Sequence, residues 1–285
     1  MHTRRIGDVD VSAIGLGAMP MSIEGRPDEE RSLATLHAAL DAGVTLIDTA
    51  DAYHLHADEV GHNESLVAKA LASHDRGDEV LVATKGGHLR PGDGSWTLDG
   101  SPRHLKEACE ASLRRLGVEA IGLYQFHRPD PKVDYAESVG AVRDLLDEGK
   151  IRMAGISNAN PEQIRQAREI LGGRLVSVQN QFSPAFRSSE PELRLCDELG
   201  IAFLPWSPLG GIAKAGELGS AHGAFARIAD ARGVSPQRVC LAWMLAKSPV
   251  VVPIPGASRP ETIRDSLAAA DLALTPEELA ELDAA

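Results

Sequence analysis

The chain alternates between short apolar runs rich in β-branched residues and longer stretches whose apolar residues recur at helical spacing. The short runs predict strands at 11–17, 44–48, 80–85, 121–127, 151–158, 175–181, 201–207 and 250–256. Helical spacing is clearest in 28–43, 101–117, 134–150 and 189–200. Strands that are apolar on both faces and alternate with helices predict a parallel sheet covered by helices.

Eight such units predict closure of the sheet into a (β/α)₈ barrel, which we expect to form a single domain over residues 1–285. An open doubly wound sheet is the main alternative. It calls for a G-x-G-x-x-G turn after an early strand, and the candidate at Gly15 fails because Pro20 holds the last glycine position. An N-terminal hairpin that turns at Gly7-Asp8 and an extra helix over 235–248 complete the prediction.

Several helix starts carry a capping residue followed by proline in the first turn. They are Ser101-Pro102, Asn160-Pro161, Ser235-Pro236 and Thr275-Pro276, and Glu278 completes a capping box with Thr275. These caps predict where four helices begin.

Composition narrows the class of protein. Hydrophobic residues make up 43% of the 285 residues, which is enough for a sizeable core. The net charge of −12 argues against a nucleic-acid partner. The chain shows neither a signal peptide nor a membrane-spanning apolar run, so we expect no membrane partner and a cytoplasmic protein. Cys109, Cys196 and Cys240 lie far apart in helical patterns, which predicts buried thiols and no metal site.

Polar residues follow the apolar runs at the points where the predicted strands end. Asp48 ends the second run and leads to Tyr53, Lys85 ends the third, and His127 ends the fourth. In a barrel these ends meet at the face that carries active sites. Any one of the four has a simple structural explanation, but an acid, a cation, an imidazole and a phenol together predict an active site.

The four side chains suit proton transfer to an oxygen. An ammonium at Lys85 would lower the pKa of the Tyr53 phenol, Asp48 would hold Lys85, and His127 would orient the substrate oxygen. Donating a proton to an oxygen implies that the attached carbon receives a nucleophile. The chain offers no convincing protein nucleophile, so we expect a hydride from a cofactor.

The chain resembles the aldo-keto reductase superfamily over nearly its whole length. The matching segments are GLGAM, DTADAY, NESLVAKAL, VATKGG, LYQFHRPDP, EGKIRMAGISN, VQNQFSP, WSPLGG, SPQRVCLAW and VPIPGAS. This resemblance implies that Asp48, Tyr53, Lys85 and His127 form the catalytic tetrad of a reductase that converts aldehydes or ketones to alcohols with a nicotinamide cofactor. The sequence of residues 127–158 favours bacterial members of the superfamily, including pyridoxal-reductase-like ones.

The resemblance also implies a cofactor site. Ser157, Asn158 and Gln179 would hydrogen-bond the nicotinamide carboxamide, and Trp206 would stack on its ring, where relatives more often have Tyr or Phe. Small residues and backbone donors would follow the pyrophosphate. These are Ser207, Pro208, Leu209 and Gly211.

Near the chain's end, the resemblance implies a site for the adenosine part of the cofactor. Gly256 replaces the lysine that some relatives use for the 2′-phosphate, which leaves Ser258 and Arg259, with Arg264 as a further candidate, to bind it. Asp265 and Ser266 match positions that contact adenine or ribose. NADP(H) is therefore favoured over NAD(H).

A small-molecule carbonyl compound is the expected partner. Its pocket is predicted to be lined by residues that follow strand ends: Met19, Met21, His54, His88, Trp96 and Arg128. The His-rich loop 54–62 fits no metal-ligand spacing, and we expect a hydrated, flexible loop there.

Two other functions stay open: a nicotinamide-sensing regulatory module with little turnover, and a barrel that binds a sugar phosphate. The substrate and the oligomeric state are left undetermined by the sequence.

Overall fold

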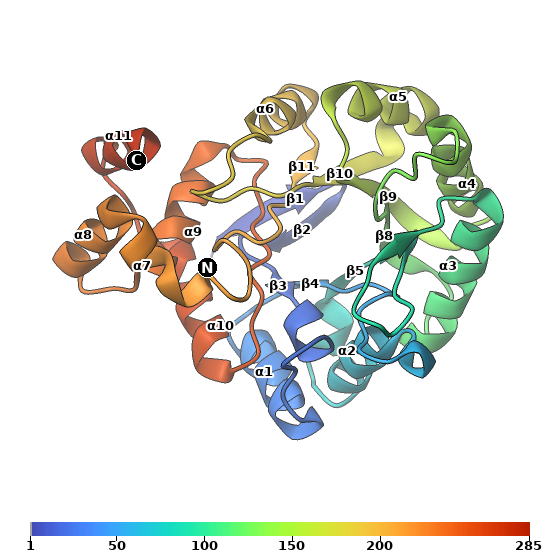
Figure 1. Ribbon diagram of the computed structural model, residues 1–285, viewed down its shortest axis with the longest axis horizontal. Helices are drawn as coiled ribbons and strands as arrows, with labels where there is room; N and C mark the ends of the chain where they lie inside the picture. Colours follow the sequence, from blue (N-terminus) through green and yellow to red (C-terminus); the bar gives the residue numbers. More distant parts are fainter. Residues whose placement is uncertain (1) are drawn as a thin grey trace.

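The computed structural model describes residues 2–285 and shows a curled parallel sheet surrounded by helices (Figure 1). Within these residues seven strands pair in the order β11-β10-β9-β8-β5-β4-β3. Their bounds are β3 (Leu16–Gly17), β4 (Leu46–Asp48), β5 (Leu81–Gly86), β8 (Ile121–Phe126), β9 (Ile151–Ser157), β10 (Leu175–Gln179) and β11 (Ala202–Phe203). The predicted (β/α)₈ barrel is confirmed.

The eighth predicted strand, 250–256, is not a regular strand, although it closes the barrel. The amide N–H groups of Val252 and Ile254 donate to Phe203 O and Pro205 O, on the β11 side. On the β3 side, the carbonyls of residues 253 and 255 accept from the N–H groups of residues 15 and 17. Both 253 and 255 are prolines, which have no N–H to return. The closing ladder therefore lacks the hydrogen bonds that residues 253 and 255 would return on that side.

Helices cover the outside of the sheet (Figure 1). They are α1 (Glu29–Asp41), α2 (His62–Ala72), α3 (Pro102–Leu116), α4 (Tyr135–Asp147), α5 (Pro161–Leu171), α6 (Glu190–Leu199), α9 (Pro236–Lys247) and α10 (Pro260–Leu267). Three further helices pack together outside the barrel beside α9: α7 (Leu218–Ala221), α8 (Gly223–Arg232) and α11 (Pro276–Ala284). The predicted helices at 28–43, 101–117, 134–150, 189–200 and 235–248 are confirmed.

The four predicted caps are also confirmed. The side chains of Ser101, Asn160, Ser235 and Thr275 each accept a hydrogen bond from the backbone N–H three residues on. The reciprocal bond from the Thr275 N–H to Glu278 completes the predicted capping box. Each cap satisfies a donor that the first helical turn would otherwise leave unpaired.

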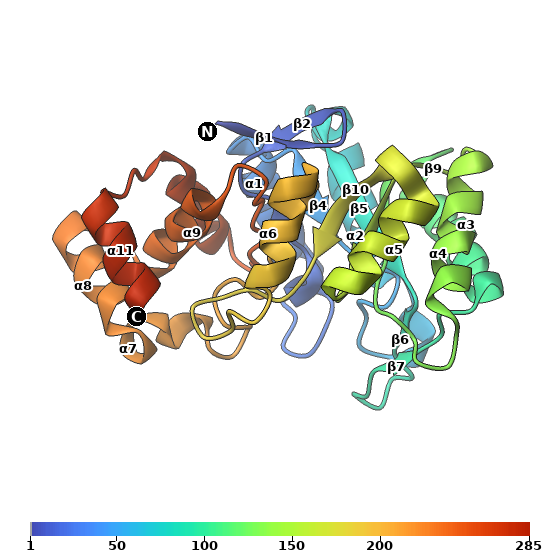
Figure 2. The ribbon, with the colours of Figure 1, turned by 90° about the horizontal axis from the view of Figure 1, so that it is seen from above.

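Two hairpins lie at opposite ends of the barrel (Figure 2). The predicted N-terminal hairpin pairs β1 (Thr3–Ile6) with β2 (Val9–Ser12). At the other end, beyond the carboxyl ends of the strands, β6 (His88–Leu89) pairs with β7 (Thr97–Leu98). Short 3₁₀ turns complete the fold at Met19–Met21, Ala57–Glu59, Gly77–Glu79, Gly172–Arg174, Ala215–Glu217 and Ala268–Asp271.

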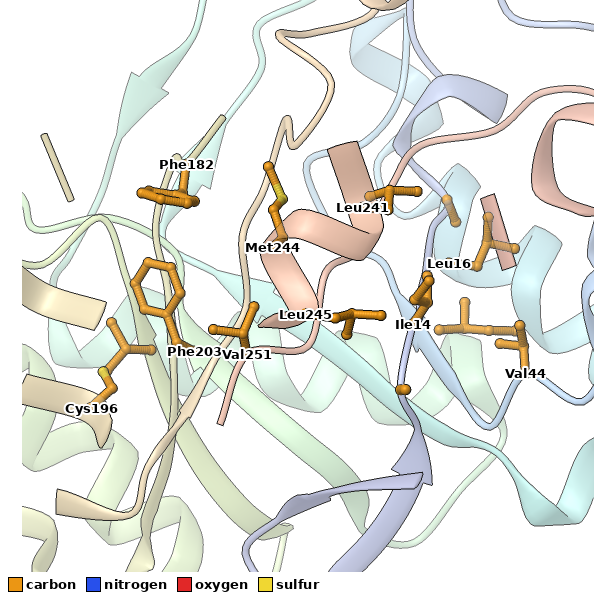
Figure 3. Close-up of a cluster of buried hydrophobic side chains, with 14 of the residues drawn as sticks. Ile14, Leu16, Val44, Phe182, Cys196, Phe203, Leu241, Met244, Leu245 and Val251 are labelled. Carbon is orange, nitrogen blue, oxygen red and sulfur yellow. The ribbon is translucent and has the colours of Figure 1, made fainter. Parts of the chain in front are cut away.

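The larger of two buried apolar clusters in residues 2–285 lies between the sheet and its helices. Leu241, Met244 and Leu245 of α9 lie between a group that contains Phe203 and one that contains Ile14 (Figure 3). The three cysteines are buried free thiols, as predicted. Among the described residues, no helix is both long and apolar enough to cross a membrane.

Candidate active site

Three side chains at the carboxyl ends of two neighbouring strands form one hydrogen-bonded group. Asp48 ends β4, Tyr53 follows it in the next loop, and Lys85 lies near the end of β5. The buried Lys85 ammonium donates to Asp48 Oδ1 at 2.6 Å, to Thr49 O at 2.8 Å and to Tyr53 OH at 3.0 Å. An ammonium has three N–H donors, and all three are used here. Because the phenol oxygen accepts from Lys85, the phenol proton is left to donate elsewhere.

Amide side chains from the barrel interior hold the second oxygen of Asp48. Gln179 Nε2 donates to Asp48 Oδ2 at 2.7 Å and Gln125 Nε2 donates at 3.4 Å. Burial raises the pKa of Asp48, and the Lys85 ammonium and the two amides oppose that rise. Burial lowers the pKa of Lys85, but Asp48 and Tyr53 outweigh it and leave that pKa above its ordinary value. Lys85 is therefore an ammonium at neutral pH.

The pKa of Tyr53 is not lowered by the neighbouring Lys85 ammonium in the way that the sequence predicted. Burial raises this pKa above its ordinary value, and the Lys85 ammonium reduces the rise without cancelling it. The predicted net lowering is wrong, because a phenolate at this position would lose its hydration and would lie close to the Asp48 carboxylate. Tyr53 is therefore a protonated phenol at neutral pH, as a general acid must be.

Two imidazoles complete the polar end of the site. The His127 ring lies edge-on to Tyr53 with 5.7 Å between ring centroids, and the His88 ring lies 4.3 Å from that of His127. Burial and the cations Lys85 and Arg128 lower the pKa of His127 well below its ordinary value. Burial and the same cations lower that of His88 to about 4. Both rings are therefore neutral, and each can donate only one hydrogen bond.

Asp48, Tyr53 and His127 open onto one cavity of about 620 Å³, with Lys85 fully buried behind them. This volume is typical of small-molecule sites. Nine predicted cofactor residues line it: Ser157, Asn158, Gln179, Trp206, Ser207, Pro208, Leu209, Gly211 and Gly256. Four predicted substrate residues do so as well: Met19, His88, Trp96 and Arg128.

Two predicted substrate residues lie outside the cavity lining. The Met21 side chain is 1% exposed and packs in the hydrophobic core, because it closes a 3₁₀ turn that points it inward. His54 is also 1% exposed, and its Nδ1 is bonded to the backbone oxygen of His56.

The loop after Tyr53 is tied to the first barrel loop. Glu59 accepts two hydrogen bonds from Arg26, at 2.8 and 2.9 Å, which lowers the pKa of Glu59 to about 2. The Gly61 N–H donates to Asp51 O.

Three His, Cys, Asp or Glu side chains do not converge as metal ligands anywhere in residues 2–285.

The predicted adenosine-binding residues Ser258, Arg259, Asp265 and Ser266 lie outside the cavity lining. The Asp265 carboxylate accepts from Arg238 at 2.6 Å and from the Ser235 hydroxyl, so it is already engaged within the protein. Ser266 is buried. Arg259 is exposed at the start of α10 and has no carboxylate partner in the described part of the chain.

Other lining residues were absent from the prediction: Gly17, Pro20, Ile23, Leu98, Ile212, Ala215 and Ile254. Gly17 ends β3 and Ile254 lies near the end of the closing segment 250–256, so the strand-end reasoning could have included them. Leu98 lies on the unpredicted β6–β7 hairpin. Ile212 and Ala215 lie on the loop before α7, whose path the pattern of apolar residues does not reveal.

The profile of the aldo/keto reductase family matches residues 13–285. An uncharacterized oxidoreductase of Schizosaccharomyces pombe is 36% identical over 287 residues, which cover 99% of this chain and 89% of that protein. A probable aldo-keto reductase of Glycine max is 32% identical over 301 residues, which cover 96% of this chain and 85% of that protein.

Solved structures agree with the sequence relatives. A glycerol dehydrogenase of Gluconobacter oxydans superposes with a TM-score of 0.84 at 30% identity, covering 99% of this chain and 94% of its own. An aldo/keto reductase of Klebsiella pneumoniae, solved with NADP and acetate, has a TM-score of 0.82 at 29% identity and the same two coverages, 99% and 94%. The barrel and its relatives define an oxidoreductase. The chain belongs to the aldo/keto reductase family.

Proposed function

We propose that this protein reduces aldehyde or ketone carbonyls to alcohols with NADP(H), and that Tyr53 is the general acid. The observation that carries the proposal is the hydrogen bond from Lys85 to Tyr53 OH at 3.0 Å. It leaves the phenol proton to a cavity whose volume suits a small molecule. The burial that keeps the phenol protonated supports the same role.

The reaction divides between the cofactor and the chain's own residues. When bound, NADPH supplies a hydride to the carbonyl carbon. Tyr53 donates its proton to the carbonyl oxygen, and the Lys85 ammonium stabilises the phenolate that remains. Asp48 keeps Lys85 charged and in place. The neutral His127 ring is positioned to donate a hydrogen bond to the same oxygen and so to orient the carbonyl.

The residues along the cavity fit a dinucleotide. Asn158 and Ser207 have φ angles of 57° and 49°, and these are the non-glycine residues of the described chain with positive φ. Both line the cavity. Strained backbone of this kind clusters at ligand sites. Trp206 would stack on the nicotinamide, and the backbone from Ser207 to Gly211 would follow the pyrophosphate.

Gln179 would bind the nicotinamide carboxamide while it also holds Asp48. One N–H of Gln179 Nε2 donates to Asp48, so the second N–H and the side-chain oxygen of Gln179 are left for the nicotinamide. Arg259, exposed and without a carboxylate partner among residues 2–285, would bind the 2′-phosphate that distinguishes NADP(H) from NAD(H).

Tyr53→Phe tests the proposal directly. NADPH consumption with a panel of aldehydes, quinones and pyridoxal should fall by about a hundredfold or more, because a general acid contributes at least that much. NADPH binding, followed by fluorescence titration, should not change. Tyr135→Phe is the matched control, since it removes a buried phenol oxygen outside the cavity lining.

Retention of the rate in Tyr53→Phe would show that the mechanism is wrong. Tight NADPH binding by the wild-type protein without turnover on the panel would support a nicotinamide-sensing module instead. Preferential binding of NADH would overturn the assignment of the cofactor and leave the role of Tyr53 intact.

A further inference from the structure

The reaction described above does not use one charged side chain of the cavity. Arg128 directly follows His127 and lines the cavity. Its Nε donates to His88 Nε2 at 3.0 Å, and its Nη2 donates to Asn158 Oδ1 at 3.0 Å. Both acceptors are neutral, because the pKa of His88 is about 4. These two bonds fix the plane of the guanidinium.

Arg128 also lacks a counterion. Within residues 2–285 it forms no salt bridge, whereas Lys85 and two cations of the loops that follow the first barrel strands are each paired with a carboxylate. Those pairs are Lys85 with Asp48, Arg90 with Glu24, and Arg26 with Glu59. A guanidinium has five N–H donors, of which the two bonds above use two. A half-buried cation without a carboxylate is costly, and burial accordingly lowers the pKa of Arg128.

The charges of the cavity leave Arg128 unbalanced. Asp48 and Lys85 cancel each other, and His88 and His127 are neutral. The polar end of the cavity therefore carries a net positive charge at Arg128, although the chain as a whole has a net charge of −12. An anion drawn into this cavity would find its counterion at that side chain.

We propose that Arg128 recognises an anionic group of the substrate, so that the carbonyl compound reduced here carries a carboxylate or a phosphate. A planar guanidinium with unused N–H donors suits either group. This inference rests on the proposed function, and it names the substrate class of the same cavity.

The position of Arg128 limits how far this anion lies from the reacting carbonyl. Arg128 is bonded to His88, whose ring lies 4.3 Å from that of His127, the residue that faces the substrate oxygen. The anionic group therefore lies a few bonds from the carbonyl. Trp96 and Leu98 lie beside His88, and Met19, Ile23 and Ile212 add further apolar lining to the cavity. The rest of the substrate is thus apolar.

The phosphates of the cofactor are the competing anions for Arg128. The loop assigned to the pyrophosphate is 207–211, whereas the two bonded partners of Arg128 are His88 and Asn158, beside the tetrad. The test must nevertheless measure NADPH affinity separately from substrate preference.

Matched substrates isolate the anionic group. Phenylglyoxylate and 4-oxo-4-phenylbutanoate are each compared with their methyl esters, and phenacyl phosphate is compared with 2-hydroxyacetophenone. The wild-type protein should prefer the anion in at least one pair by about tenfold or more in kcat/KM, because a hydrogen bond to a charged group is worth at least that ratio. The pair that shows the preference distinguishes carboxylate from phosphate.

Arg128→Gln should abolish this preference, because it raises KM for the anion far more than KM for its neutral partner. Arg128→Lys keeps the charge without the fork and should retain part of the preference. Arg174→Gln is the control, because it removes an exposed arginine paired with Asp147, directly before β10 and so at the opposite end of the barrel.

A readout without turnover completes the test. Binding of 3-phenylpropionate, a carboxylate with no reducible carbonyl, to the NADPH complex should weaken about tenfold or more in Arg128→Gln. Equal losses for anionic and neutral substrates would show that Arg128 only supports His88 and Asn158, and would overturn the proposal. Loss of NADPH affinity in Arg128→Gln would overturn it in favour of a cofactor contact. Reduction of neutral carbonyls with no anion preference would overturn it while leaving the proposed function standing.

Discussion

Replacing Lys85 with methionine removes the centre of the hydrogen-bonded group while keeping the volume of the side chain roughly constant. The Asp48 carboxylate would then lie buried with only the amides of Gln179 and Gln125 as donors. Tyr53 would lose the donor that directs its own proton toward the cavity. The substitution therefore affects folding and catalysis by separate routes.

The structure sets the scale of both effects. Lys85 is fully buried and its ion pair with Asp48 spans 2.6 Å, so breaking the pair leaves an unpaired buried charge. Such losses cost about 3–5 kcal/mol of unfolding free energy. Removing the group that stabilises the phenolate should lower kcat by about 10²- to 10⁴-fold.

A double variant separates the two effects. We expect Lys85→Met alone to be destabilised, whereas Asp48→Asn combined with Lys85→Met removes both charges and should recover about 1 kcal/mol or more of stability. Urea denaturation measures the unfolding free energy, and NADPH consumption measures kcat. The double variant should stay as inactive as Lys85→Met, because stability returns without the ammonium.

Two results would contradict this reasoning. Unchanged stability in Lys85→Met would mean that the buried carboxylate is neutral without its partner. Recovery of activity in the double variant would mean that the lysine acts through the fold and not through Tyr53.

Two further predictions concern stability. In Gly17→Ala a new Cβ would lie 2.8 Å from Ile254 O, so the free energy of unfolding should fall by about 1–3 kcal/mol. Gly140→Ala in α4, where a Cβ meets no atom within 4 Å, should be neutral or stabilising; an equal loss in both variants by urea denaturation would refute the packing argument. The pKa of His88 falls from 6.5 to about 4 on folding, so its contribution to stability is fully present above pH 6.5 and is lost as the pH falls toward 4. In His88→Gln the amide oxygen can still accept from Arg128. Between pH 7 and pH 4 the free energy of unfolding of this variant should therefore fall by up to about 3 kcal/mol less than that of the wild type. Identical pH dependence of the two unfolding free energies would rule out this role of His88.

Much of the fold could be predicted because its signals are local. Apolar periodicity located the strands and helices, and capping residues such as Ser101 and Thr275 marked where helices begin. The closing segment shows the limit of this reasoning. Its apolar run predicted a strand, but Pro253 and Pro255 leave it without the N–H groups that a full ladder requires.

The cavity residues followed from a rule of topology. Parallel strands of a barrel place their carboxyl ends at one face, so Asp48, Lys85 and His127 could be grouped from their positions at strand ends. The same rule could not separate Met19 from Met21. A turn of the backbone sends one side chain to the cavity and the other into the core.

The sequence by itself determined the barrel, the order of its elements and the identity of the polar residues at its open end. Only the tertiary structure decided what those residues do to one another. It reversed the expected direction of the Tyr53 pKa, because burial depends on everything packed around the phenol and not on Lys85 alone. It also bonded Gln179 to Asp48 and left Arg128 without a carboxylate partner among the described residues. Hydrogen bonds and desolvation depend on distances between segments far apart along the chain, which periodicity and spacing do not contain.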